Sequence, residues 1–211
     1  MFITLEGPEG SGKTSQIPLL ADHIRSLGHE VLLTREPGGT FIGDQIRNVL
    51  VSLENKALTP QSETLLFLAA RAQLVHEVIQ PALARGMVVL SDRYADATLA
   101  YQGYGHGVDL DTLRQLLAFA TGGLQPNLKI LLDIDVENGL RRKTDCGEWN
   151  RLDAYSVAFH ERVRNGYHSL VSSEPGKWIV LDASKDREIV QADLRKAVET
   201  ALKIYLTNPE T

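Results

Sequence analysis

FITLEGPEGSGKT, residues 2–14, joins a short apolar run to a glycine-rich loop. The β-rich run FITLE, residues 2–6, is typical of a buried β-strand. Residues 7–14 then match GxxxxGK[ST], in which glycines let backbone amides turn towards phosphates while the following helix directs its positive N-terminal end at them. Strand, loop and helix in this order predict a P-loop in an α/β protein.

Further apolar runs at residues 30–34, 87–91, 129–135 and 177–182 indicate four more strands. Longer segments separate them, so we expect right-handed crossovers and a doubly wound, five-stranded parallel sheet whose strands are buried on both faces. Apolar residues at helical spacing predict one helix from residue 65 to Gly86 and another over about 153–171. Residues 35–40 and 102–107 are expected to be loops because of their glycines.

The size and composition of the chain limit what it can be. With 211 residues, 43% of them hydrophobic, we expect a single domain over residues 1–211. A formal net charge of -5 argues against nucleic-acid and membrane-surface binding. The single cysteine, Cys146, argues against an intrachain disulfide and a cysteine-rich zinc site, which suits the cytoplasm. No apolar stretch approaches the roughly 18 residues of a membrane helix, and no signal peptide is recognisable.

The P-loop and the strand over 87–91 supply candidates for binding ATP and magnesium. Lys13 would reach the β- and γ-phosphate oxygens, and the Thr14 hydroxyl would bind Mg²⁺. Asp92, at the end of that strand, would hold the same ion, unless Asp92 and its neighbour Arg93 only form an ion pair at a strand end. The expected ATP-binding residues are Gly7, Gly10, Ser11, Gly12, Lys13 and Thr14.

A P-loop alone leaves kinases, GTPases and ATP-driven machines open. GTPases of the switch type carry Asn-Lys-x-Asp for guanine, whereas Asn55-Lys56 is followed here by Ala57 and Leu58, which disfavours that class.

The order of the remaining motifs resembles the thymidylate kinase family. These motifs are GPEGSGKT (7–14), REPGGT (35–40), IGDQIR (42–47), LLFLAARAQ (65–73), DRYADATLAYQG (92–103) and VLDAS (180–184). The resemblance implies transfer of the γ-phosphoryl group of ATP to dTMP, with Mg²⁺, in a cytoplasmic homodimer. REPGGT and DRYxxxTxAYQG are more specific to this family than the P-loop itself.

The resemblance also assigns the acceptor site. Glu9 would accept a hydrogen bond from the 3′-hydroxyl of the sugar, and Tyr101 would crowd its 2′ carbon. Phe67 would stack on thymine and Arg71 would donate to its O4, although without the family Phe67 could equally be core and Arg71 an exposed charge. Thr98 and Gln102 would lie beside the base, and the candidates for the acceptor phosphate are Arg93, Arg47 and Arg35, any of which could instead be a structural ion pair.

Phosphoryl transfer needs positive charge more than a covalent nucleophile, so Lys13 and Arg93 require help. In the bacterial subgroup of the family a mobile lid supplies an arginine, and residues 139–153, GLRRKTDCGEWNRLD, resemble that lid. Arg142 and Arg151 are the candidates for the catalytic guanidinium, and a solvated basic helix end is the alternative. Residues 150–153 read Asn-Arg-Leu-Asp where the family usually has Asp-Arg-x-Glu, and Ala97 stands where serine is common.

Two rival functions remain at this level. Another nucleoside monophosphate or small-metabolite kinase would share the fold and differ only in the base pocket. A P-loop ATPase that drives a conformational change would not need the acceptor-phosphate arginines.

Overall fold

The computed structural model of the chain describes residues 1–145, 147 and 149–207. Cys146, on which the expectations about disulfides and zinc rest, therefore lies outside the described residues, as does Glu148 in the expected lid. Among the helices that are described, none is long and apolar enough to cross a membrane.

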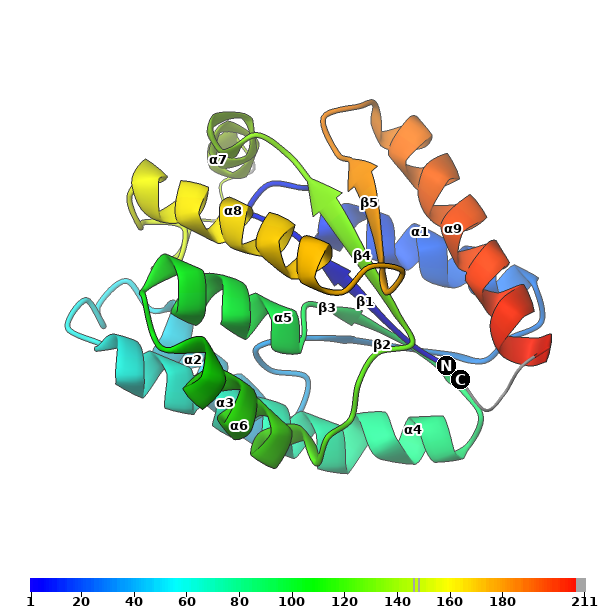
Figure 1. Ribbon diagram of the computed structural model, residues 1–211, viewed down its shortest axis with the longest axis horizontal. Coiled ribbons are helices and arrows are strands. Elements are labelled where there is room, and N and C mark those ends of the chain that lie inside the picture. The colour runs from blue at the N-terminus through cyan, green and yellow to red at the C-terminus, as the bar shows by residue number, and fades with distance from the viewer. Residues whose placement is uncertain (146, 148, 208–211) are drawn as a thin grey trace.

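The centre of the fold is a parallel sheet of five strands (Figure 1). Its strands are β1 (Phe2–Glu6), β2 (Val31–Arg35), β3 (Val88–Asp92), β4 (Leu128–Asp133) and β5 (Trp178–Asp182), in the order β2-β3-β1-β4-β5. This confirms the predicted fold class. Because β1 pairs with β3 in a register that sets Leu5 beside Asp92, the P-loop and the end of β3 emerge at the same edge of the sheet.

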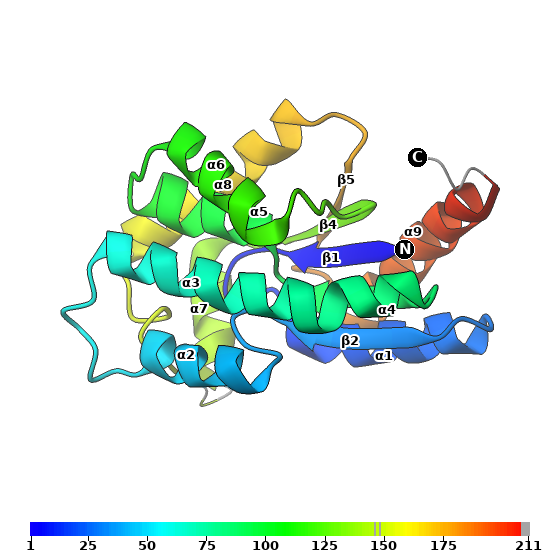
Figure 2. The same ribbon diagram turned by 90° about the horizontal axis from the view of Figure 1, so that it is seen from below.

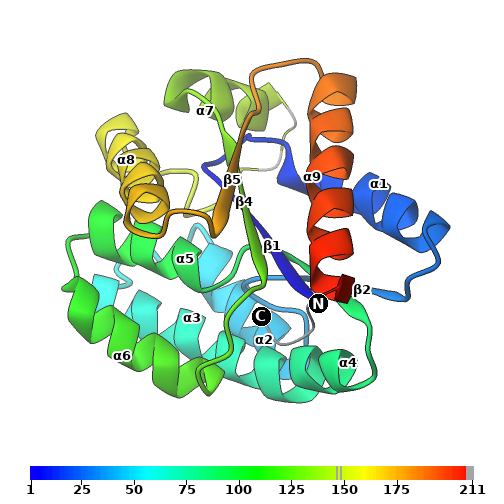
Figure 3. The same cartoon turned by 45° about the vertical axis from the view of Figure 1, so that its right-hand side comes forward.

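Helices cover both faces of the sheet (Figure 3). α1 (Lys13–Ser26) and α9 (Arg187–Thr207) pack with alternate strand residues such as Ile3, Leu5 and Leu90 in one apolar cluster. Phe2 and Val89 face the opposite cluster. The remaining elements are α2 (Phe41–Val51), α3 (Pro60–Leu74), the π-helix η1 (Val75–Ile79), α4 (Gln80–Ala84), α5 (Ala95–Thr98), the π-helix η2 (Leu99–Gly105), α6 (Leu110–Thr121), α7 (Val136–Asp145) and α8 (Val157–Ser173).

The two edge strands correct the expectation that every strand is buried on both faces. In β2 and β5 the burial alternates, and Leu33 and Val180 are 36% and 44% exposed. Both are edge strands, with a neighbouring strand on one side only. The three inner strands are buried along nearly their whole length.

The helix expected from residue 65 to Gly86 is longer and less regular than predicted. α3 begins at Pro60, where the Thr59 side chain accepts a hydrogen bond from the Ser62 amide. The π-turn η1 then joins α3 to α4 along one rod (Figure 2). The rod ends as predicted near Gly86, which has a φ of 79°.

Two local expectations were wrong. The helix expected from residue 153 begins at Val157, because the Ser156 side chain caps it by accepting from the Phe159 amide. The glycine-rich segment 102–107 was expected to be a loop, yet most of it belongs to η2. Its glycines serve packing: a Cβ at Gly105 would lie 2.7 Å from the Phe159 ring of α8.

Candidate functional site

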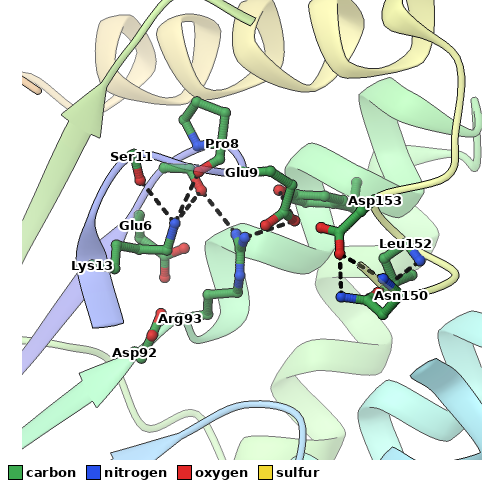
Figure 4. A network of polar contacts seen from close by, with 12 residues as sticks. Glu6, Pro8, Glu9, Ser11, Lys13, Asp92, Arg93, Asn150, Leu152 and Asp153 are labelled. Atoms are coloured by element: carbon green, nitrogen blue, oxygen red, sulfur yellow. Dashed lines mark hydrogen bonds and ion pairs between the residues drawn. The ribbon is translucent and has the colours of Figure 1, made fainter. Parts of the chain in front are cut away.

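The P-loop connects β1 to α1, and its lysine points back over the loop (Figure 4). The Lys13 ammonium donates to the carbonyl oxygens of Gly7 and Pro8 at 2.9 and 3.0 Å and to the Ser11 hydroxyl at 2.9 Å. Gly7 and Gly12 have φ angles of 141° and 87°, which other residues rarely adopt. Burial, together with the nearby Arg93, lowers the pKa of Lys13 to about 8, and a phosphate anion bound beside it would favour the charged form.

Oxygen atoms from two elements meet beside this lysine. The Thr14 hydroxyl, at the start of α1, donates to the Asp92 carboxylate at 3.2 Å. A hydroxyl and a carboxylate are ligands that suit Mg²⁺, which usually completes its shell with phosphates and water. The described residues contain no group of three or more His, Cys, Asp or Glu side chains able to hold a metal by themselves.

Arg93 lies between the P-loop and the interior of the protein. Its backbone is in the left-handed region, with a φ of 71°, immediately after β3. The guanidinium donates to the Gly7 carbonyl at 2.9 Å and to the Glu9 carboxylate at 2.9 Å (Figure 4). It also lies over the Tyr101 ring, 4.9 Å from its centroid. The backbone conformation costs about 1–3 kcal/mol, so the surrounding contacts must hold Arg93 in this place.

Glu9 is ionised despite its enclosure. Burial alone would raise the pKa of its carboxyl, but Arg93 and Lys13 more than offset this and lower the pKa to about 2. The Tyr101 hydroxyl donates to the same carboxylate oxygen at 2.9 Å. Conversely, Glu9 raises the pKa of Arg93 against the effect of burial. The pair is therefore a fixed anion and cation at the junction of two cavities.

The predicted base-binding residues come together in the smaller cavity. It is lined by Glu9, Glu36, Pro37, Phe67, Arg71, Arg93, Ala97, Thr98, Tyr101, Gln102 and Leu152. Phe67 and Arg71 come from α3, whereas Thr98, Tyr101 and Gln102 come from α5 and η2. The alternative in which Arg71 is an exposed charge is wrong, because the side chain is 1% exposed.

Arg71 is held by a carboxylate that the sequence reading did not single out, Glu36 of REPGGT. The guanidinium donates to Glu36 through Nε at 2.7 Å and through Nη2 as well. Nη2 also donates to the Tyr94 carbonyl and Nη1 to the Thr98 hydroxyl, each at 2.8 Å. Since arginine has five N–H donors, one N–H of Nη1 remains for a ligand. Thr98, which accepts from Arg71, keeps its own hydroxyl hydrogen to donate.

A second unpredicted carboxylate, Glu63 of α3, organises the far side of this cavity. It accepts from Gln102 at 2.8 Å, from Tyr155 at 2.8 Å and from Arg151 at 2.6 Å. Burial would raise the pKa of Glu63, but these hydrogen bonds and one with His106 lower it to about 2. Arg151 also donates to the Leu50 carbonyl at 2.7 Å. Its guanidinium is thus bound between α2 and α3 and does not line the P-loop cleft.

The larger cleft, of about 660 Å³, lies over the P-loop and gathers most of the predicted cations. Arg35, Arg47, Arg93, Arg142 and Lys143 all line it. Arg47 donates to the Pro37 carbonyl at 2.9 Å, and burial together with Arg35 lowers its pKa. Arg142 donates to the carbonyl oxygens of Ala183 and Ser184, in the segment after β5. Positive charge is therefore concentrated in the cleft over the P-loop, where it would attract an anionic ligand.

Comparison with known proteins agrees with this geometry. A family profile described as "Thymidylate kinase" matches residues 5–194. The chain is 47% identical to a thymidylate kinase of Herpetosiphon aurantiacus, over 98% of each chain. It is 49% identical to one of Geotalea uraniireducens, over 93% of this chain and 95% of the relative. The crystal structure of thymidylate kinase from Ehrlichia chaffeensis superimposes with a TM-score of 0.76 at 33% identity and covers 94% of this chain and 98% of its own.

Proposed function

The chain belongs to the thymidylate kinase family and is an ATP-dependent nucleoside monophosphate kinase that phosphorylates dTMP, and we propose that the P-loop cleft and the adjoining smaller cavity hold ATP and dTMP end to end. One observation supports this arrangement above all others. The P-loop cleft and the smaller cavity share five lining residues, Glu9, Glu36, Pro37, Arg93 and Leu152. Two nucleotides bound in them would therefore meet at the Glu9–Arg93 pair.

In the proposed acceptor site, Phe67 stacks on the thymine ring and the remaining N–H of Arg71 donates to O4. Thr98 donates from its free hydroxyl hydrogen, so both groups present hydrogen to the 4-position of the base. A 4-amino group, itself a donor, would leave them without acceptors. Gln102 is held beside the base by Glu63.

The sugar and phosphate of dTMP would lie next to Glu9. The Glu9 carboxylate accepts from the 3′-hydroxyl, and Tyr101, fixed by its hydrogen bond to Glu9, leaves no room for a 2′-hydroxyl. Arg93 binds the acceptor phosphate, with Arg47 and Arg35 as further cations of the same cleft.

For the transfer itself, Lys13 neutralises the β- and γ-phosphate oxygens, and the amides of Gly7, Gly10, Ser11 and Gly12 form the cradle. Thr14 and Asp92 would hold Mg²⁺, which supplies charge neutralisation on the phosphate oxygens when it is bound. Of the two lid candidates, Arg142 is favoured because it lines the cleft, whereas Arg151 is bound to Glu63.

Three wider properties are part of the same proposal: a single kinase domain with residues 139–153 as a mobile lid, a cytoplasmic location, and a homodimer. The dimer is supported by apolar side chains on neighbouring helices. Phe41 of α2, Leu65 of α3 and Phe119 of α6 are 81%, 58% and 89% exposed. Exposed apolar side chains that gather on one face mark interaction sites.

A coupled assay of ADP release with a panel of nucleoside monophosphates tests the proposed function. We expect strong stimulation by dTMP and weak stimulation by dCMP. ADP release that does not depend on an acceptor would instead indicate an ATPase. Equal stimulation by every monophosphate would contradict the proposed base pocket.

A further inference from the structure

Gly10 occupies a position that the P-loop motif leaves open. GxxxxGK requires glycine at residues 7 and 12, whereas residue 10 is one of the variable positions. Its φ of 68° is in the left-handed region, which suits glycine. The structure adds a second, independent reason, because another backbone lies directly against it.

That backbone belongs to Gly139 of α7. A Cβ added to Gly10 would overlap the Gly139 carbonyl oxygen and would lie 2.8 Å from the Gly139 Cα. A Cβ added to Gly139 would overlap the Glu9 carbonyl oxygen and would lie 3.3 Å from Cγ2 of Ile134. Gly139 has an ordinary helical backbone, and its amide donates to the Asp135 carbonyl. Glycine is therefore needed at 139 for close approach and not for conformation.

α7 has few buried side chains, and its other contacts include the packing against α8 and the hydrogen bonds of Arg142 to Ala183 and Ser184. Of its described residues, only Val136 and Gly139 are buried. Glu137, Asn138, Arg141 and Arg142 are exposed. The backbone contact with the P-loop therefore acts together with these contacts to determine where the helix lies.

The position of α7 matters because it carries cations to the cleft. Arg142 and Lys143 follow Gly139 by about one helical turn, and both line the cleft over the P-loop. On the other side of the contact, the Glu9 side chain binds Arg93. Any shift of α7 relative to residues 9 and 10 would therefore move side chains proposed to bind ATP relative to side chains proposed to bind dTMP.

We propose that Gly10 and Gly139 form a glycine seat, a direct backbone contact that sets the position of α7, and hence of Arg142, over the ATP side of the cleft. Both glycines are positioning residues for phosphoryl transfer. This inference rests on the proposed function, in which Arg142 acts on the ATP side.

The test compares Gly139→Ala with Glu137→Ala, an exposed position in the same helix. Alanine is a better helix former than glycine, so the helix itself should not be weakened by Gly139→Ala. The added methyl must move α7 or residue 9, and a misplacement of about 1 Å can cost about 100-fold in rate. We therefore expect kcat/KM for ATP to fall about 100-fold in Gly139→Ala, and Glu137→Ala to keep wild-type values.

A double-mutant cycle with Arg142→Ala separates positioning from general damage. If the seat acts through Arg142, Arg142→Ala should lower kcat/KM strongly in the wild type and several-fold less in the Gly139→Ala background. Equal fold losses in both backgrounds, wild-type activity of Gly139→Ala, or no loss in Arg142→Ala would each overturn the inference. A wild-type protein that fails to phosphorylate dTMP would refute the proposed function instead.

Should Gly139→Ala lower the Tm, amide hydrogen exchange of the wild-type protein decides the question. Binding of ADP with Mg²⁺ should slow exchange in residues 140–145 of α7 together with the P-loop. Exchange in α7 that is unaffected while the P-loop becomes protected would overturn the inference.

Discussion

The buried Glu36–Arg71 pair allows a test of how the base pocket is built. Its two side chains are 4% and 1% exposed, and Glu36 receives two N–H donors of Arg71. Three variants are informative: Glu36→Gln, Arg71→Met, and both together. Each single change leaves one buried charge without its partner, whereas the double change removes both charges.

Breaking a buried pair from one side costs about 3–5 kcal/mol. Glutamine retains one acceptor oxygen, so Glu36→Gln should lower the free energy of unfolding by an amount near the lower end of this range, about 3 kcal/mol. For a chain of this size, about 1 kcal/mol shifts the Tm by about 2–4 °C, which predicts a decrease of about 6–12 °C. The double variant should lose less stability than either single variant, because no buried charge remains.

Stability and dTMP binding should respond differently, which distinguishes a structural from a recognition role. Thermal unfolding measures the first, and KM for dTMP in a coupled assay measures the second. The double variant should regain Tm but keep a KM for dTMP raised at least about 10-fold, since a hydrogen bond to a charged donor is worth about 1.5–3 kcal/mol. If the two single effects on Tm simply add, the pair is not coupled and the reasoning is refuted.

The stability of Arg71→Met should also depend on pH, and the direction of that dependence follows from the pKa of Glu36. Burial raises the pKa of Glu36, and Arg71 opposes that effect. Without Arg71, the pKa of Glu36 in the folded protein rises further above its value in the unfolded chain. Protonated Glu36 then favours the folded state at low pH, and this contribution is lost as the pH rises through the folded pKa. The stability deficit relative to wild type should therefore be larger at pH 8 than at pH 5.

Three further predictions concern other parts of the site. Arg93→Ala should mainly weaken dTMP binding and Arg142→Ala should mainly lower kcat, so equal losses of dTMP affinity by calorimetry would contradict this division. Glu63→Gln should lower the free energy of unfolding by about 3 kcal/mol at pH 7, because the pKa of Glu63 is lowered to about 2 in the folded protein. Urea unfolding should show that this difference from wild type becomes smaller as the pH falls from 4.5 to 2. Tyr101→Ala should raise kcat/KM for the ribose analogue of dTMP relative to dTMP itself, and an unchanged ratio would exclude steric selection of deoxyribose.

The sequence predicts best what local patterns determine. Five apolar runs gave the five strands to within about one or two residues at most ends, because burial of short β-rich segments leaves a continuous apolar signature. The P-loop followed from spacing alone. The residues around the base required the family resemblance, since a phenylalanine and an arginine four residues apart on a helix fit a core and a surface equally well.

The partners of these residues could not be predicted, because they come from distant segments. Glu36 and Arg71 are 35 residues apart, and Glu63 and Arg151 are 88 residues apart. Glu36 lies in the REPGGT motif, but no local pattern names Arg71 as its partner, and Glu63 has no distinctive local pattern at all. Only the fold reveals that Glu36 binds Arg71, which we propose to contact the base, and that Glu63 binds Arg151 away from the P-loop cleft. The glycines of residues 102–107 led to a wrong prediction of a loop, because glycine also occurs where helices pack closely.

The carboxylate within the P-loop is compatible with anion binding because of how β1 and β3 pair. Their register sets Arg93 beside Glu9, so the negative charge is matched before any phosphate arrives. Arg93 uses three N–H groups, on Gly7, Tyr167 and Glu9. Since a guanidinium has five, two remain for an acceptor phosphate without breaking the pair. A phosphate and a sugar hydroxyl can thus bind on either side of one ion pair, which is what a dTMP molecule placed in line with ATP requires.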